Sequence, residues 1–447
     1  SVVRQEIPSE NSLLPLLADS AMDRPRKLLS VASVNLFYAF NDFKPVWTGR
    51  SSLNQRGDSL LRFISTAHYS GLFAEDYHIK EIGDISREVK ISAGPLESLS
   101  ALDILLTDAF IGIGYHIRHG RLQKDGMYRY ENLPETDTAL VELLSRSVME
   151  NNISGILESL EPEKASYKIL KKQLKRKLDS LSVAAGHASI LEDQIRQLTV
   201  NMEQLRWEAT DSSERYIFVN IPSFKLGIVE HDSLVFESNV VVGTTGTPTP
   251  TLDAVIKSFV VFPAWNVPRK IAAHELLPKI KSDSSYLSSH NYRVYDNSGK
   301  MIDPDSISWK KYHADNFPFR IQQSEGDHNA LGIIKFIFAN EYDVYLHDTN
   351  AKKSFDKEYR ALSHGCVRVE KALDMARFLL NDNNPYCSVN DFERYIHSRQ
   401  QRQICMNPID LRIRYYTCEP RKDGSVYFHP DVYGVNSTIM EAMFCNN

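Results

Sequence analysis

The residues of this chain best suited to chemistry are a cysteine and a histidine at short spacing. Cys366 ends the run Ser363-His364-Gly365-Cys366, and His347 precedes it. A free cysteine titrates near pH ~8.5, so it needs a basic partner to react as a thiolate, and a nearby histidine can be that partner. The small Gly365 admits a substrate, and the backbone N–H groups of Gly365 and Cys366 are candidate oxyanion donors. We therefore expect acyl transfer at Cys366, with His347 as general base and cationic partner of the thiolate.

Three side chains near this pair are candidates for holding a substrate or the loop. His364, beside Ser363 in the loop, is expected either to line the oxyanion site or to order the loop. Arg368 suits bidentate binding of a carboxylate, and a local salt bridge is its alternative role. Tyr345 lies two residues before His347, so strand alternation predicts that both side chains share one face.

A metal centre is the main chemical alternative, and the sequence argues against it. His347, His364 and Cys366 are suitable ligand types, but no fourth ligand follows at a zinc-site spacing and no paired CxxC occurs. The stretch His274–Pro278 begins like the HExxH motif of zinc proteases but ends in proline. A papain-like protease normally has its cysteine before its histidine, the reverse of the order here. We expect neither a metal ion nor an organic cofactor.

Length and composition indicate an ordinary globular protein of several domains. The 447 residues are too many for one core, and 42% hydrophobic with 24% charged residues argues against wholesale disorder. The net charge of −5 gives no reason to expect a nucleic-acid partner. The most apolar stretch, Ala101–Ile117, contains Asp103 and Asp108 and predicts a buried helix. No signal peptide is visible; Ser1 fits either a mature N-terminus or a fragment boundary, and a membrane tether upstream of it is compatible with both.

The five cysteines are all found near one end of the chain. None precedes Cys366, and Cys387, Cys405, Cys418 and Cys445 follow it. Four clustered cysteines and one odd thiol fit two disulfides and one free nucleophile, with three pairings open. Disulfides would indicate an oxidising compartment such as a periplasm, and the alternative is four unrelated thiols.

Two kinds of periodicity divide the chain. Up to about residue 210, apolar residues recur at helical spacing, most clearly at 28–40, 102–113, 167–181 and 191–205. From there, short β-type runs follow at 216–221, 225–229, 234–242 and 254–262. The irregular segment 266–330 is typical of a functional insertion. The sequence predicts an α+β chain with a helical domain over 1–210 and a β-rich domain over 211–447 that carries 266–330 as an inserted cap.

Local patterns in three smaller segments also predict structure. Glu370–Leu380 predicts a helix after the cysteine motif. Arg412–Thr417 and Ser425–Phe428 predict a final hairpin around Asp423-Gly424. The basic run Lys171–Lys177 is interpreted as a solvated helix face rather than a site for an anionic polymer.

The cysteine motif resembles the YkuD-type catalytic domain of L,D-transpeptidases, in which a histidine precedes Ser/Thr-His-Gly-Cys. Further phrases are similar to the large YcbB-like branch of that family: Phe37-Tyr38 with Pro45–Thr48, Gln197–Glu203, Trp265–Pro268, Leu276–Lys279, Asn329–Gly332, Tyr345–Thr349 and Leu362–Arg368. The resemblance covers most of the chain. One departure is that residues 150–190 are too short and too charged for the peptidoglycan-binding module that many members carry, so wall anchoring through that module is not expected.

The resemblance implies an exported, periplasmic L,D-transpeptidase whose partners are peptidoglycan stem peptides. Cys366 would attack a tetrapeptide donor, release D-Ala, and pass the thioester to the amine of a second stem, giving a 3→3 cross-link. Trp265 and Asn266 are similar to family positions near the cleft, with ordinary packing as their alternative role. Carbapenem-type β-lactams would acylate Cys366. The alternatives are an L,D-carboxypeptidase that trims tetrapeptide stems and a non-catalytic wall-binding scaffold.

Overall fold

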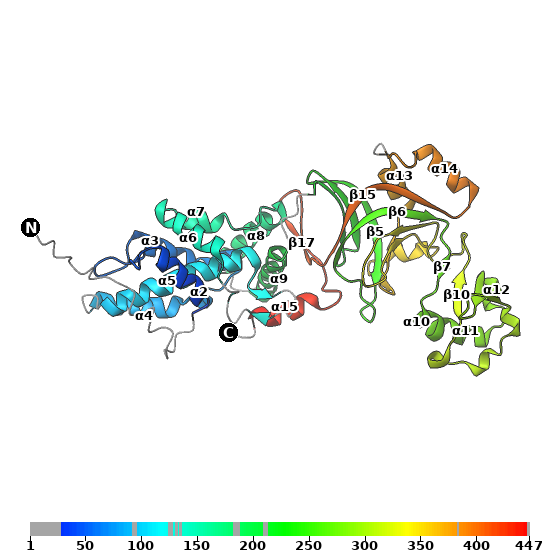
Figure 1. The fold of residues 1–447 in the computed structure, drawn as a ribbon, viewed down its shortest axis with the longest axis horizontal. Helices are drawn as coiled ribbons and strands as arrows, with labels where there is room; N and C mark the ends of the chain where they lie inside the picture. Colours follow the sequence, from blue (N-terminus) through cyan, green and yellow to red (C-terminus); the bar gives the residue numbers. More distant parts are fainter. Residues whose placement is uncertain are drawn as a thin grey trace, which may run out of the picture. The chain divides into compact units, whose positions relative to one another are not determined.

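The chain folds into two compact units. The computed structural model describes residues 28–91, 96–123, 128–129, 133, 136–181, 188–208, 213–381 and 384–444. One unit comprises Ser1–Asp211 with Thr417–Asn447, and the other comprises Ser212–Tyr416 (Figure 1). A helical unit followed by a β-rich unit agrees with the predicted α+β class. Residues 417–444, expected from the sequence in the β-rich domain, lie with the helical unit instead.

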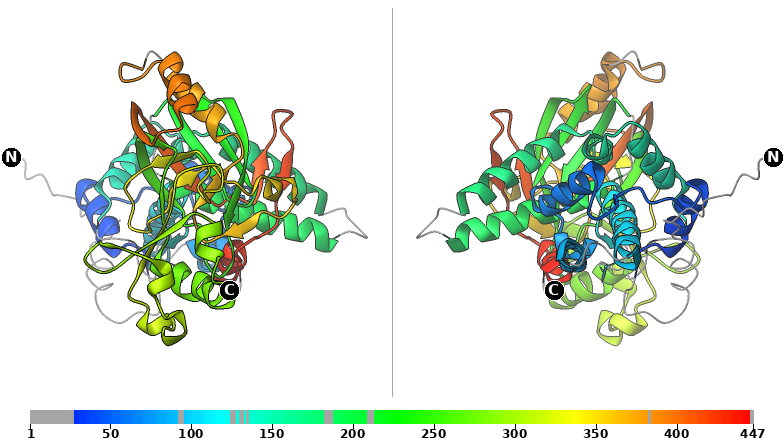
Figure 2. Two further views of the ribbon diagram at one scale, coloured as in Figure 1. Left: turned by 90° about the vertical axis from the view of Figure 1, so that its right-hand side faces the viewer. Right: turned by 90° about the vertical axis from the view of Figure 1, so that its left-hand side faces the viewer.

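The first unit is built mainly from helices. They are α2 (Val31–Phe40), α3 (Gln55–Ser65), η1 (Ala67–Ser70), η2 (Ala74–Tyr77), α4 (Ile79–Ile91), α5 (Leu96–His119), α6 (Thr138–Met149), α7 (Ile153–Glu158), α8 (Ala165–Leu181), α9 (Ala188–Arg206) and α15 (Val435–Phe444). Two short hairpins pair β1 (Leu122–Gln123) with β2 (Tyr128–Arg129), and β16 (Cys418–Pro420) with β17 (Val426–Phe428). The four helices expected from apolar spacing are confirmed as α2, α5, α8 and α9, and the last two lie side by side (Figure 2).

Helix α5 is buried along most of its length, including its two aspartates. Asp103 accepts hydrogen bonds from the backbone N–H groups of residues 46–48 at 2.8–2.9 Å. Asp108 accepts from those of residues 29–30 at 2.8 Å. Buried backbone donors need acceptors, so the two carboxylates fasten neighbouring segments onto this helix. Within the described ranges, no helix has the length and apolar character needed to cross a membrane.

The C-terminal segment joins the helical unit through α9. Asn201 donates from Nδ2 to Thr417 Oγ1 at 2.9 Å and accepts the Cys418 N–H at 3.0 Å. Helix α15 adds Ile439 and Met443 to a small apolar cluster in the same unit. The predicted final hairpin is therefore wrong in its first strand, because residues 412–414 end a long strand of the other unit and the hairpin is β16–β17.

The second unit contains one large mixed sheet. Its described strands are β3 (Arg215–Asn220), β4 (Lys225–Glu230), β5 (Ser233–Gly243), β6 (Leu252–Val261), β11 (Ile334–Ile337), β12 (Leu346–His347), β13 (Ala361–Ser363), β14 (Val367–Val369) and β15 (Arg402–Arg414). They lie in the order β13-β5-β14-β12-β11-β6-β15-β3-β4, and an added pairing of β4 with β5 curls the sheet back on itself. The strands predicted from 216 to 262 are confirmed as β3 to β6.

The register of this sheet separates an apolar face from a polar one. Phe259, Phe336, Leu346 and Val367 pair in succession across β6, β11, β12 and β14, and all four are fully buried. Phe392 packs against Phe259 at 5.8 Å between ring centroids. Phe392 lies in α14 (Val389–Ser398), which follows α13 (Ala372–Leu380), the helix predicted at 370–380. Because adjacent residues of a strand alternate, the neighbours of this apolar row point to the opposite face.

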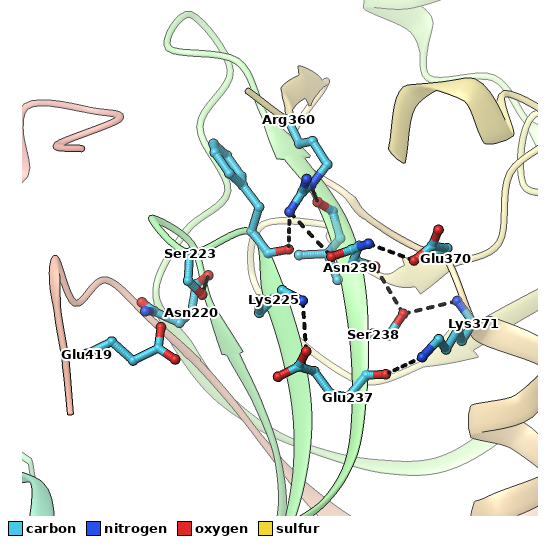
Figure 3. Close-up of polar contacts among 12 residues, drawn as sticks. Asn220, Ser223, Lys225, Glu237, Ser238, Asn239, Arg360, Glu370, Lys371 and Glu419 are labelled. Carbon is cyan, nitrogen blue, oxygen red and sulfur yellow. Dashed lines mark hydrogen bonds and ion pairs between the residues drawn. The ribbon is translucent and has the colours of Figure 1, made fainter. Parts of the chain in front are cut away.

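The two strands that flank the cysteine motif, β13 and β14, lie on opposite sides of β5, and residues next to both strands are fastened to β5 (Figure 3). Arg360, just before β13, donates to the backbone carbonyls of Val240 at 3.2 Å and Phe224 at 3.3 Å. Glu370, just after β14, accepts from Asn239 Nδ2 at 2.8 Å. These contacts hold the two strands on either side of the motif in a defined register.

The insertion is a folded subdomain rather than an irregular segment. Its elements are β7 (Trp265–Asn266), α10 (Arg269–Ile271), the π-helical turn η3 (Ala272–Leu276), α11 (Leu277–Ser282), α12 (Tyr286–Ser289), β8 (Tyr292–Tyr295), β9 (Met301–Ile302), η4 (Pro304–Ser306), η5 (Trp309–Lys311), η6 (Ala314–Asn316) and β10 (Arg320–Gln323). The strands form a small sheet in the order β7-β10-β8-β9, of which Figure 1 labels β7 and β10. A separate apolar core lies within it, including Leu276, Ile280, Val294, Phe317 and Ile321.

The prediction of two disulfides is wrong. Cys387, Cys405 and Cys418 are free thiols, and Cys445 lies outside the described residues. Two disulfides would need all four cysteines. Burial raises the pKa of the Cys418 thiol well above its ordinary value, and burial also raises that of Cys387. The cysteines therefore carry no argument for an oxidising compartment.

Candidate active site

Strand register brings five reactive side chains to one face of the large sheet. Lys335 on β11 pairs with His347 on β12, and His347 pairs with Arg368 on β14. Tyr345 and Cys366 directly precede β12 and β14, and both side chains lie beside this row: the Tyr345 ring is 5.4 Å from the His347 ring, and the Cys366 sulfur interacts with Lys335 and Arg368. This face is the one opposite the apolar row, and it carries both the sequence-predicted nucleophile and the sequence-predicted base.

The loop of the motif is closed by its own hydrogen bonds. Ser363 Oγ donates to the Cys366 carbonyl at 2.6 Å and accepts the Gly365 N–H at 3.2 Å. Thr249 Oγ1 donates to the Gly365 carbonyl at 2.8 Å. Gly365 has a φ of 107°, a conformation that side-chain-bearing residues rarely adopt. Since the Gly365 N–H is already used within the loop, the Cys366 N–H is the better oxyanion donor of the two predicted.

His347 is placed to act as a neutral base. Its Nδ1 hydrogen bonds the carbonyl oxygen of Asp348. Because a carbonyl only accepts, Nδ1 carries the hydrogen and the lone pair of Nε2 is left for a proton. Burial, then the positive charge of Arg368, lowers the pKa of His347 from 6.5 to about 3, against the Asp348 hydrogen bond, which raises it. The imidazole is therefore uncharged at neutral pH.

Cys366 is a thiol in the resting structure. Burial raises its pKa, while hydrogen bonds from Tyr345 and the charges of Lys335 and Arg368 lower it without overcoming burial. Among the described contacts, the sulfur's hydrogen-bonding partner is Tyr345 and not His347. The sequence predicts a thiolate held by a cationic imidazole, and this structure has a neutral thiol and a neutral imidazole instead.

Tyr345 occupies the position predicted from strand alternation. Its ring lies edge-on to the His347 ring, with centroids 5.4 Å apart. Lys335 Nζ lies 3.8 Å from the Tyr345 ring centroid. Burial, then the neighbouring Cys366, raises the pKa of the Tyr345 hydroxyl, so it remains a hydrogen-bond donor to the sulfur.

Trp265 and Asn266, both predicted to lie near the cleft, have different surroundings. The Trp265 side chain is close enough to lower the pKa of the Tyr345 hydroxyl. Its buried indole N–H nevertheless makes no well-formed hydrogen bond to a described residue. Asn266 is exposed and its Oδ1 accepts from Gln322 Nε2 at 2.8 Å, within the sheet of the insertion. Trp265 thus belongs to the surroundings of the nucleophile, and Asn266 to the insertion.

The predicted loop residue His364 connects the motif to the insertion. Its Nε2 lies 2.6 Å from Glu275 Oε1, in the π-helical turn η3, and both side chains are about half exposed. This contact favours an ordering role for His364 over a place in the oxyanion site. Single π-helical turns are frequent at functional sites, and this one faces the nucleophile loop.

Two members of the site were missed from the sequence. Lys335 alternates with the buried Ile334 and Phe336, and a lysine within an apolar strand is the signal that could have found it. Glu275 carried no signal, because it lies 89 residues from its partner His364. In the described ranges, no group of three or more His, Cys, Asp or Glu side chains is arranged to hold a metal ion.

Comparisons with known proteins match both units. Residues 32–174 match the Scaffold domain, and residues 214–390 match YkuD, the L,D-transpeptidase catalytic domain. A Haemophilus influenzae protein named "Putative L,D-transpeptidase" is 31% identical over 424 residues, which span 90% of this chain and 78% of that protein. A solved structure, the Ldtfm-avibactam carbamoyl enzyme, matches with a TM-score of 0.21 and 9% identity, over 45% of this chain and 49% of its own. That last likeness is too weak to support an argument.

Proposed function

Because this chain belongs to the L,D-transpeptidase family, we propose that it forms 3→3 cross-links between peptidoglycan stem peptides through a thioester on Cys366. The donor is a tetrapeptide stem that loses D-Ala, and the acceptor is the side-chain amine of a second stem. The observation that carries the proposal is the shared sheet face of Cys366, His347 and Tyr345, next to a loop held in register at both ends.

In the first half-reaction, the Cys366 sulfur attacks the carbonyl carbon of stem residue three. The thiol proton passes to Nε2 of His347, and the Cys366 N–H donates to the oxyanion that forms. The bond from that carbon to the D-Ala nitrogen breaks, and His347 returns the proton to the leaving amine. The thiol has to turn from the Tyr345 hydroxyl toward His347 for this step. Hydrogen bonds of this kind commonly form only in the substrate complex.

In the second half-reaction, the amine of the acceptor stem attacks the thioester carbon. His347 accepts a proton from the amine and gives it to the departing sulfur, so the free thiol is restored. Water competes with the amine at this stage, and the inserted subdomain is proposed to exclude it by covering the donor stem. The contact of Glu275 with His364 supports this role, because it joins the insertion to the nucleophile loop.

The setting of the reaction follows from its substrate. Stem peptides are found in the cell envelope, and the protein is proposed to act there, in the periplasm. Carbapenem-type β-lactams are proposed to acylate the same sulfur, because they present an activated carbonyl to the same nucleophile. The residues of the site supply a nucleophile, a base and an oxyanion donor, so the mechanism uses no metal ion or organic cofactor.

The test is incubation of the purified protein with a disaccharide-tetrapeptide, followed by mass spectrometry of the products. The proposal expects a cross-linked dimer together with one free D-Ala for each bond formed. Trimmed tripeptides without dimers would replace the transferase with an L,D-carboxypeptidase. Unchanged substrate, with protein that remains folded, would overturn both.

A further inference from the structure

Two cations flank the base and the nucleophile without a counter-ion. Lys335 and Arg368 are the cross-strand partners of His347 on either side, so all three side chains leave the sheet in the same direction. Strands lie about 4.8 Å apart, which places the backbones of the two cations about 10 Å apart with the imidazole between them. A small anion between their side chains could contact both.

Neither cation has an acidic partner among the described residues. No carboxylate of the described residues lies within 4.0 Å of Lys335 Nζ or of the Arg368 guanidinium, whereas many other cations form such pairs, as Lys225 does with Glu237 at 2.8 Å. Arg368 Nε is buried and has no hydrogen-bond partner. The groups that raise the pKa of Lys335, against the effect of burial, are the Cys366 sulfur and then Asp343. Burial lowers the pKa of both groups, which is the direction expected where a buried cation has no anion beside it to offset the loss of water.

We propose that Lys335 and Arg368 form an anion subsite beside Cys366, and that it binds the terminal carboxylate of the donor stem. The identity of this carboxylate rests on the proposed function. In a tetrapeptide donor, the attacked carbonyl and the terminal carboxylate are separated by one residue, a span of at most ~3.6 Å. A carboxylate held at the subsite therefore places that carbonyl at the sulfur. A stem longer by one residue carries its carboxylate too far away, so the subsite also selects stem length.

A purely electrostatic role is the competing explanation. Two cations near a thiol favour its thiolate form, and they could do so without touching a substrate. The two roles differ in what they do to reagents of different charge. A thiolate-stabilising role acts equally on every electrophile, whereas a carboxylate subsite favours the reagent that carries a carboxylate.

Iodoacetate and iodoacetamide make this comparison, because both alkylate Cys366 with loss of iodide and only the first is an anion. The rate of each is measured by intact mass on the folded protein, and the ratio of the two rates is the readout. We expect Lys335→Gln and Arg368→Gln each to lower the ratio of iodoacetate to iodoacetamide about tenfold, the worth of one charge-assisted hydrogen bond. Lys335→Arg should keep most of the ratio. The matched control is Lys225→Gln, which removes a lysine that is paired with Glu237 (Figure 3) and should leave the ratio unchanged.

An equal fall in both rates in Lys335→Gln, with an unchanged ratio, would overturn the subsite. A second experiment uses the wild-type protein, so its result does not depend on whether the variants fold. N-acetyl-D-alanine should protect Cys366 from iodoacetamide, and its amide, which lacks the carboxylate, should not. Equal protection by both, or by neither, would also overturn the proposal. None of these rates requires cross-linking, so a protein with the anion preference but without transpeptidation would refute the proposed function and retain the subsite.

Discussion

Removing the hydroxyl of Tyr345 should make Cys366 a weaker acid. This hydroxyl hydrogen bonds the sulfur and is among the groups that lower the pKa of the thiol, against the burial that raises it. Tyr345→Phe deletes that donor and keeps the ring that packs beside His347. The thiolate then loses a partner, while the neutral thiol loses little, so the pKa of Cys366 should rise.

The magnitude follows from the strength of such a bond. A hydrogen bond to a charged group contributes about 1.5–3 kcal/mol, and one pKa unit corresponds to about 1.4 kcal/mol, so the expected rise is about one to two units. The thiolate fraction at fixed pH falls about 10- to 100-fold, but a more basic thiolate is also more nucleophilic, with a Brønsted slope of about 0.45. The net alkylation rate at neutral pH should fall about 3- to 12-fold.

The assay is the rate of iodoacetamide alkylation of Cys366 from pH 5 to pH 10.5, followed by intact mass. In the wild type the rate should climb through the neutral range, because the resting sulfur is protonated. In Tyr345→Phe the whole curve should move to higher pH. Tyr359→Phe is the control, since this exposed tyrosine packs on Phe224 and should leave the curve in place. A Tyr345→Phe curve that coincides with the wild type, in folded protein, would refute the assigned hydrogen bond.

Three further perturbations test other parts of the account. Gly365→Ala should lower kcat, because the φ of 107° strains alanine by about 1–3 kcal/mol. The protein should stay folded, since the added Cβ would lie 3.6 Å from its nearest neighbouring atom. Unchanged turnover would argue that the loop conformation is unimportant. Asp103→Asn should lower the unfolding temperature of the helical unit in calorimetry, because an amide cannot accept all the N–H groups that this carboxylate binds. The free energy of unfolding should fall by about 2–4 kcal/mol. An unaltered transition would contradict this role of Asp103. The catalytic unit should lose stability as pH falls from 6.5 toward 3, because His347 is protonated in the unfolded chain at a higher pH than in the folded one. This effect lowers the free energy of unfolding by at most about 5 kcal/mol. Denaturant titrations in which His347→Gln keeps the full acid sensitivity would rule it out.

Local patterns in the sequence were enough to locate most of the elements. Apolar spacing placed α5 and α9, and alternation placed β3 to β6, because these patterns depend on residues close together in the chain. The end of the final strand was misplaced, since residues up to 414 pair with β3 and β6 across the sheet and residues from 417 bind Asn201 far upstream. Tertiary pairing decided that boundary, and the local pattern carried no trace of it.

In the candidate site, too, local relations were predictable from the sequence and tertiary ones were not. Tyr345 lies beside His347, as its spacing of two residues predicted, because this relation is local in the chain. The charge state of His347 was not predictable, because it depends on burial and on the pairing with Arg368 and Lys335. The disulfide expectation failed for a related reason: cysteine count and clustering do not report whether side chains meet in space.

If a stem peptide is held on Cys366 as a thioester, the intact mass of the protein during turnover should reveal it. The protein is mixed with a disaccharide-tetrapeptide whose side-chain amine is acetylated, so that it serves as donor but not as acceptor, then acid-quenched within seconds and digested for peptide mapping. We expect an added mass equal to the donor minus D-Ala, located on the peptide that contains Cys366, and absent in Cys366→Ala. Release of D-Ala with the adduct on another residue, or by Cys366→Ala itself, would contradict it.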